Sequence, residues 1–299
     1  MKKQILGNIA LFLTALIWGL SFVAQRAGME YVGPYTFNVV RSFIGGLSLL
    51  PLIFIPKLLC EDTRTPRKKQ VQHIRLAQAG IWCGIALFIA MTIQQYCMIY
   101  VPAGKAGFIT ALYIVYVPVI SMLFLKQRLS KNAKISVMLA VMGLYLLCFK
   151  QDCGCFSFYD LLLLIAAFFY GVHILVVNHF SEKVHAVKAS CLQFFVVGLL
   201  SLPLMLIFEN VTWTSILNCK VPLLYAGILT CGVAYTLQIV GQKYTVPVIA
   251  SLILCLESVF AVLGGAIILH ETMTPKEIWG CVLMIIAVVL AELKPWKRI

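Results

Sequence analysis

One acidic side chain, Glu257, occupies a position where its chemistry would be unusual. It lies near the middle of a long apolar segment, about 10 residues or ~15 Å from either end if the segment is helical. If that segment spans a membrane, a charge there costs roughly 2.5–3.5 kcal/mol, so the carboxyl should face a wet cavity, pair with a base or be protonated. A group that gains and loses a proton inside a membrane could couple proton movement to the passage of a solute. The alternative is a hydrogen-bonded residue that packs between helices.

Three further polar side chains lie inside apolar segments and could bind a solute. Arg41 is about six residues, or ~9 Å, inside its segment by helix rise. Its planar guanidinium could meet a substrate carboxylate or balance Glu257 across a cavity, or it could extend back to the lipid headgroups. Gln94 and Gln238 carry amides that both donate and accept, which suits a site that binds and releases a solute. Their alternative role is hydrogen bonding between helices.

Aromatic residues and one histidine complete the set of candidate binding residues. Tyr113, Trp18 and Tyr235 could line the same path, although an aromatic side chain in an apolar helix more often packs. His173 could relay a proton to Glu257, because histidine titrates near physiological pH; a buried neutral ring is the alternative.

Three prolines lie inside apolar segments and are candidate hinges. Pro118, Pro51 and Pro203 each lack the N–H group that a continuous helix needs. We therefore expect the chain to bend at these positions when it moves.

The composition excludes an ordinary soluble enzyme. Of 299 residues, 62% are hydrophobic and 12% are charged, whereas soluble domains have roughly 45–50% apolar and about 25% charged residues. The apolar residues form ten stretches and predict an all-α integral membrane protein with ten transmembrane helices. The stretches cover approximately residues 7–25, 35–56, 77–98, 103–125, 131–149, 158–178, 187–208, 221–242, 247–269 and 277–293.

The basic residues predict the orientation of these helices. With the N-terminus in the cytoplasm, 18 Lys and Arg residues fall in inside segments, five fall in outside loops, and Arg41 falls within a helix. Because Lys and Arg collect in cytoplasmic loops, both termini are predicted to be cytoplasmic. The net charge of +13 then reflects orientation, so we expect the lipid bilayer and no nucleic acid as a partner.

The sequence contains no recognisable motif for ATP hydrolysis, intramembrane hydrolysis or metal binding. It contains no GxxxxGK[ST], GxSxG or HExxH pattern, so we expect no ATP-driven pump and no intramembrane hydrolase. Cys153 and Cys155 share a short loop without a nearby histidine, a spacing that favours neither a disulfide nor a metal site. We therefore expect no metal and no cofactor.

The chain contains an internal repeat. A shift of 144 residues aligns Gln94 with Gln238 and Tyr113 with Glu257, and a shift of 152 aligns Pro51 with Pro203. The predicted halves are residues 1–150 and 151–299, each with five helices. Because five is odd, the second half enters the membrane from the opposite side. Such inverted repeats around a central cavity are typical of secondary transporters.

Two stretches resemble the EamA-type repeats of the drug/metabolite transporter superfamily. Residues 15–22, with the pair Trp18 and Gly19, are similar to the family's first helix, which Arg41 follows in the second. Residues 256–261, followed by Glu271 and Gly280, are similar to its ninth and tenth helices. The sequence departs from the family pattern at three positions, Ser258, His270 and Gln127.

The resemblance implies a ten-helix secondary carrier of a small organic solute such as an amino acid or amine, commonly an exporter in a bacterial inner membrane. We expect alternating access, with proton coupling through Glu257 as one option and a fixed counter-ion for a cationic group as the other. A single chain should suffice for function. The alternatives are a passive facilitator of the same fold and a non-transporting membrane scaffold.

Overall fold

The computed structural model describes residues 2–59, 66–101, 103–124, 126, 130–148, 157–268 and 273–292. These residues form an all-α bundle with no strand among them. Several positions named above lie outside the described residues: Gln127, Cys153, Cys155, His270 and Glu271.

The helices follow one another with short connections. In chain order they are α1 (Lys2–Gly28), α2 (Pro34–Leu59), α3 (Pro66–Cys97), α4 (Ala103–Ala111), α5 (Tyr113–Phe124), α6 (Lys131–Cys148), α7 (Phe158–Phe180), α8 (Ala186–Phe208), α9 (Trp213–Asn218), α10 (Lys220–Leu224), the π-helix η1 (Tyr225–Ala234), α11 (Tyr235–Gln242), α12 (Pro247–Leu254), α13 (Glu257–Ile268) and α14 (Pro275–Glu292).

Each of the ten predicted apolar stretches is helical where it is described, apart from turns at Met98, Leu112, Cys255 and Leu256. Within the described part of the chain, eight segments are long and apolar enough to cross a membrane; α4 with α5, α10 to α11, and α12 with α13 each count as one. Helices satisfy their own backbone hydrogen bonds, as a chain in lipid must. The remaining two, α6 and α14, have 18 residues each, and their crossing stays a prediction.

The packing of the helices repeats across an approximate two-fold axis. Helix α2 packs on its repeat mate α8, and α6 packs on its mate α14. A Cβ atom added at Gly46 would lie 3.2 Å from the Phe195 ring, and one added at Gly198 would lie 3.1 Å from the Phe43 ring. The shift of 152 residues exchanges these two contacts, so the repeat detected in the sequence is also a repeat of packing.

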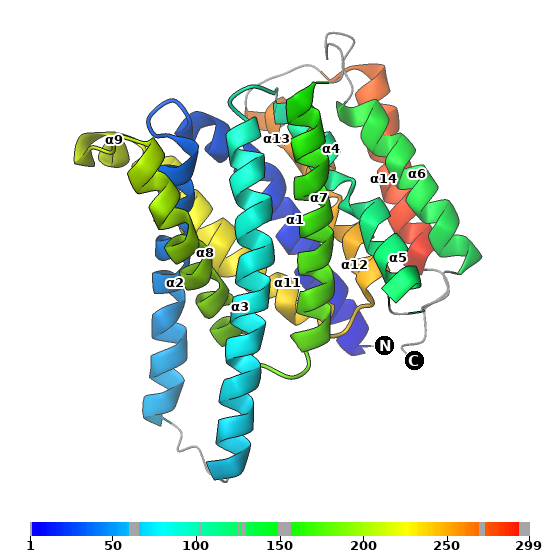
Figure 1. Ribbon diagram of the computed structural model, residues 1–299. Helices are drawn as coiled ribbons and strands as arrows, with labels where there is room; N and C mark the ends of the chain where they lie inside the picture. The colour runs from blue at the N-terminus through cyan, green and yellow to red at the C-terminus, as the bar shows by residue number, and fades with distance from the viewer. Residues whose placement is uncertain are drawn as a thin grey trace.

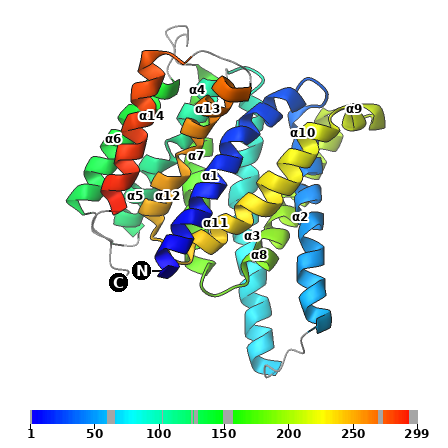
Figure 2. The same cartoon turned by 180° about the vertical axis from the view of Figure 1, so that it is seen from behind.

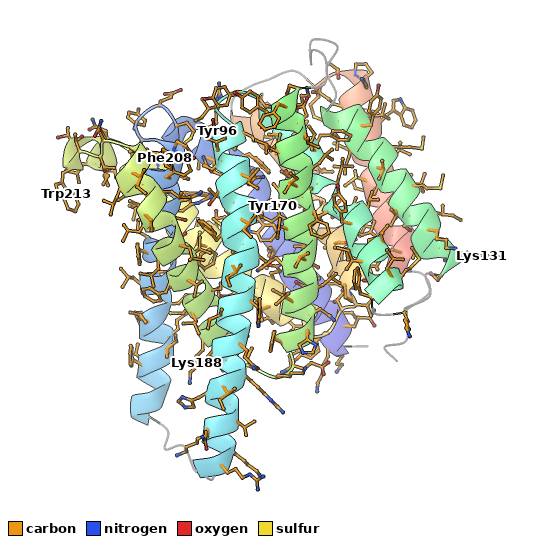
Figure 3. The ribbon with its side chains drawn as sticks, viewed as in Figure 1. Tyr96, Lys131, Tyr170, Lys188, Phe208 and Trp213 are labelled. Carbon is orange, nitrogen blue, oxygen red and sulfur yellow. The ribbon has the colours of Figure 1, made fainter. Side chains whose placement is uncertain are left out.

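The repeat mates run in opposite directions. Helix α2 ends at the lower end of the bundle in Figure 1, whereas α8 ends at the upper end beside α9. The start of α1 and the end of α14 lie at the same end (Figures 1 and 2). We call this the inner end, after the orientation that the basic residues predict. Lys188 lies toward it, whereas Phe208 and Trp213 lie at the outer end (Figure 3).

Two of the predicted helices are broken at equivalent positions. The break between α4 and α5 is at Leu112, and the break between α12 and α13 is at Cys255 and Leu256. The Leu112 N–H donates to Ile109 O at 3.2 Å, and the Leu256 N–H donates to Ile253 O at 3.1 Å. A shift of 144 residues exchanges these bonds. Each break places a fresh helix start near the middle of the bundle.

The prolines do not mark these breaks. Pro118 lies inside α5, after the break at Leu112, and Pro203 lies inside α8. Pro51 lies inside α2. Their role as hinges stays a prediction.

Candidate functional site

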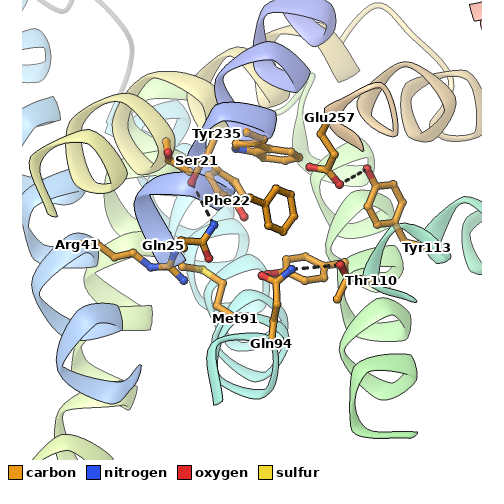
Figure 4. A pocket seen from close by; sticks show the side chains of 13 residues that line it. Ser21, Phe22, Gln25, Arg41, Met91, Gln94, Thr110, Tyr113, Tyr235 and Glu257 are labelled. Atoms are coloured by element: carbon orange, nitrogen blue, oxygen red, sulfur yellow. Dashed lines mark hydrogen bonds between the residues drawn. The ribbon is translucent and has the colours of Figure 1, made fainter. Parts of the chain in front are cut away.

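A cavity in the outer half of the bundle brings together most of the predicted binding residues. Its volume is about 50 Å³, which is room for a few water molecules. Gln25 and Gln94 place it toward the outer end, because each lies three residues before the end of its helix, α1 and α3 respectively. The side chains that line it come from both repeats (Figure 4): Trp18, Ser21, Phe22, Gln25, Arg41, Met91, Gln94, Thr110, Tyr113, Tyr170, Thr230, Tyr235 and Glu257.

Glu257 and Tyr113 meet at the centre of the molecule. The Tyr113 hydroxyl donates to Glu257 Oε1 at 3.1 Å, and the two residues are exact repeat mates, 144 positions apart. A second pair with the same separation lies beside them, where Cys255 Sγ donates to Ala111 O at 3.4 Å. Because mates can touch only near the axis that relates them, the two-fold axis passes between these residues.

The broken helices explain why a carboxylate is tolerated here. Tyr113 and Glu257 are the first residues of α5 and α13, directly after the two breaks. The start of a helix carries a partial positive charge, which favours a negative side chain in its first turn. Discontinuous helices near the membrane midplane are a recurring way to build a transport site.

Arg41 lies on the other side of the cavity from Glu257 (Figure 4). Its side chain is buried, with 2% exposure, so it does not extend to the headgroups. The guanidinium donates to Asn38 Oδ1 at 2.6 Å and lies 5.3 Å from the centre of the Phe37 ring. Among the described residues, its Nε has no hydrogen-bond partner, and no carboxylate lies within ion-pair distance of the guanidinium. Arg41 and Glu257 thus form no direct ion pair in this conformation, and the balance of their charges across the cavity stays a prediction.

Gln94 links three helices at the wall of the cavity. Its Oε1 accepts from the Tyr170 hydroxyl at 2.7 Å, and its Nε2 donates to Thr110 Oγ1 at 3.2 Å. Trp18 and Tyr235 form an aromatic wall, with ring centres 4.6 Å apart. The cavity thus combines two separated ionisable groups, an amide and several aromatic rings.

Gln238 and His173 lie elsewhere. Both are buried, at 0% and 1% exposure, and neither lines the cavity. The His173 ring meets Tyr235 edge-on at 5.7 Å, and its Nε2 lies 3.2 Å from Gln193 Oε1. The direct proton relay from His173 to Glu257 is not formed, because the hydrogen-bond partner of His173 is Gln193.

Several lining residues were not among the sequence candidates. Tyr170 is the clearest, because it is the mate of Trp18 at the shift of 152, and the repeat itself could have identified it. Thr230 enters through the π-helix η1, a helix type that frequently occurs at functional sites. No pattern in the sequence indicated that element.

The comparisons with known proteins agree with this architecture. The model of the EamA-like transporter family matches residues 5–149 and 157–293. The chain belongs to this family. A protein of Archaeoglobus fulgidus named an uncharacterized transporter is 32% identical over 295 residues, covering 98% of this chain and 87% of that protein. The uncharacterized transporter YoaV of Bacillus subtilis is 26% identical over 300 residues, covering 95% and 94%.

A solved structure shares the fold of this EamA-family chain. It is titled "Crystal structure of protein", aligns with a TM-score of 0.75 at 17% identity, and covers 96% of both chains. Together with the apolar helices, these findings make the chain a multi-pass membrane protein of a transporter family.

Proposed function

We propose that this EamA-family chain is a secondary transporter that moves an amino acid, or a similar solute with an acidic and a basic group, outward across the bacterial cytoplasmic membrane. The observation that carries the proposal is the placement of Arg41 and Glu257 on opposite sides of one aromatic-lined cavity without an ion pair between them. A solute that brings both charges would satisfy both side chains.

Each part of such a solute has a complementary surface in the cavity. Its carboxylate would accept from the Arg41 guanidinium, a charge-assisted bond that can be bidentate. Its ammonium group would donate to Glu257, in place of or beside the Tyr113 hydroxyl. Its carbon chain would lie against the rings of Trp18 and Tyr170. A mostly apolar pocket with a few placed polar groups is the usual form of a small-molecule site.

The cavity must change shape to admit the solute. A volume of about 50 Å³ holds a few waters, whereas ligand pockets measure about 300–1,000 Å³. We propose that the halves 1–150 and 151–299 rock about the axis between Tyr113 and Glu257, exposing the cavity to each side in turn. Both termini would be cytoplasmic. One chain would suffice for function.

Glu257 would couple transport to protons if it is protonated in one state and ionised in the other. If it stays ionised, it is a fixed counter-ion for the cationic group of the solute. Replacement of Glu257 by Gln tests the coupling role. Transport that continues undiminished with unaltered pH dependence would exclude the coupling role.

A ligand screen followed by a flux assay tests the proposal. Purified protein is heated with amino acids, amines lacking the carboxylate, acids lacking the amine, sugars and nucleosides. A ligand at about 100 times its dissociation constant adds about 2.7 kcal/mol to the free energy of unfolding. We expect amino acids to stabilise the wild type more than either truncated analogue. Stabilisation by the amines alone would contradict the role of Arg41.

Proteoliposomes then distinguish a carrier from its rivals. Unlabelled solute inside the vesicles should accelerate uptake of labelled solute, because a carrier exchanges one molecule for another. Flux without this acceleration would favour a passive facilitator. Binding without flux of any solute in the panel would favour a scaffold.

A further inference from the structure

A second cluster of buried polar side chains lies on the inner side of the cavity. It consists of His173 of α7, Gln193 of α8 and Gln238 of α11, with exposures of 1%, 0% and 0%. His173 and Gln193 lie 3.2 Å apart through Nε2 and Oε1. Gln193 Nε2 and both side-chain polar atoms of Gln238 have no hydrogen-bond partner among the residues that the structure describes. Such buried groups destabilise a protein, so a fully enclosed, unsatisfied amide needs an explanation.

The cluster is the two-fold image of the polar lining of the cavity. The shifts of 144 and 152 residues that relate the two halves carry one set onto the other. The image pairs are Gln94 with Gln238, Arg41 with Gln193, and Ser21 with His173. Tyr113 and Glu257 lie on the axis, and the same symmetry places each at the position of the other. An inverted repeat therefore contains this polar surface twice, once for each side of the membrane.

Tyr235 separates the two surfaces. Its ring lines the cavity and packs at 4.6 Å from Trp18 and 5.1 Å from Phe194, measured between ring centres. The same ring contacts His173 at 5.7 Å. Tyr235 is thus the floor of the cavity in this conformation, and the cluster lies directly beneath that floor.

The cluster continues toward the inner end. Gln242, one helical turn after Gln238, donates from Nε2 to Ile174 O on α7 at 2.8 Å. Gln238 therefore lies between Tyr235 and Gln242, two residues of one helix segment that both contact α7. Beyond them, Thr245 donates to Asn8 Oδ1 at 3.0 Å. Polar side chains thus mark a route from the floor to the start of α12.

We propose that His173, Gln193 and Gln238 form a second binding subsite, which opens to the inner end when the two halves exchange conformations and there binds the polar head of the transported solute. The inference rests on the proposed transport function. In the opened state the amides of Gln193 and Gln238 hydrogen-bond to the solute or to water, which satisfies the atoms that are unpartnered here.

The two subsites differ in charge. Where the outer surface has the guanidinium of Arg41, the inner one has the uncharged amide of Gln193. A guanidinium has a positive charge and a planar fork of donors that an amide lacks, so the carboxylate of an amino acid should bind more weakly from the inner side. We expect half-saturation concentrations about tenfold higher at the inner face than at the outer face.

Cysteine accessibility tests the subsite without knowledge of the solute. The probe is a methanethiosulfonate with a trimethylammonium group, which does not cross the bilayer. The variants are Gln238→Cys and, as the matched control at the image position, Gln94→Cys. Wild type sets the labelling background of the chain's eleven cysteines, of which Cys83, Cys97, Cys191, Cys219, Cys231, Cys255 and Cys281 are buried. We expect Gln238→Cys to react in inside-out vesicles and Gln94→Cys to react in intact cells.

Two results would overturn the inference: reaction of Gln238→Cys from the outer face, or no reaction from either face while Gln94→Cys is labelled. If Gln238→Cys fails to reach the membrane, Gln193→Cys carries the same expectation and is judged in the same way. The flux of the wild type is measured in the same membranes. Labelling as expected without any exchange would instead refute the transport function.

Discussion

Replacement of Arg41 by Gln should remove the ability to distinguish an acid from its neutral analogue. Gln keeps a hydrogen-bond donor but loses the charge and the planar fork of donors. Arg41 is 2% exposed and has no carboxylate partner among the described residues, so binding of a solute carboxylate breaks no existing ion pair. A hydrogen bond to a charged group contributes about 1.5–3 kcal/mol. We therefore expect affinity for the amino acid to fall roughly 10- to 150-fold.

The assay compares two ligands on two proteins. Dissociation constants are measured for the best amino acid of the screen and for its carboxamide, which lacks the negative charge. Wild type should prefer the acid, and Arg41→Gln should bind both about equally. Arg26→Gln is the matched control, because Arg26 donates to Met98 O and does not line the cavity. The reasoning is refuted if Arg41→Gln retains the preference for the acid or loses affinity for both ligands by the same factor.

Three further changes test other parts of the structure. Tyr113→Phe keeps the ring but removes the donor to Glu257, and exchange flux should fall about tenfold; a normal rate would show that this bond is dispensable. Gly84→Ala would place a Cβ 2.6 Å from Val196 and should lower the free energy of unfolding by about 1–3 kcal/mol. Gly107→Ala, whose Cβ would lie 3.8 Å from the nearest atom, should not lower stability in the same thermal denaturation. Glu209→Gln removes the negative charge of the carboxylate that accepts from the Thr36 N–H at 2.7 Å and from the Thr36 hydroxyl at 2.5 Å. We expect the free energy of unfolding to fall by about 1 kcal/mol, and unchanged stability would contradict this.

The membrane architecture follows from features that are strong in the sequence. Apolar stretches of membrane length predict helices because the backbone has no other partner in lipid. The repeat shift of 144 residues also located the pair at the axis, since Tyr113 and Glu257 are mates and the structure places them 3.1 Å apart. Both results depend on local composition and on symmetry, and neither requires knowledge of side-chain packing.

The breaks at Leu112 and Leu256 could not be predicted in this way. Neither position has a proline or glycine beside it, and beside the first break Ala111 O accepts a tertiary hydrogen bond from Cys255 Sγ of the other repeat. Pro118 is the stronger helix breaker by sequence, yet it lies inside α5. Packing across the two-fold axis therefore determines where α5 and α13 start within the bundle.

The sequence also could not assign residues to one conformation. Gln94 and Gln238 were predicted to line the same cavity because the repeat makes them equivalent. The structure places only Gln94 there, because the two copies of an inverted repeat face opposite sides of the membrane. Gln238 and His173 do not line this cavity, and their part in binding stays a prediction. A sequence contains the lining residues of every conformation, whereas one structure shows the lining of a single conformation.

The central claim is that one cavity with a carboxylate on its axis exchanges solute between the two sides. Counterflow in proteoliposomes, measured at two pH values for wild type and Glu257→Gln, tests it most directly. We predict that internal amino acid accelerates uptake by wild type, and that Glu257→Gln loses most of this exchange at both pH values. Equal exchange by the two proteins would contradict the account, because the only acidic side chain among the described residues that line the cavity would then take no part in transport.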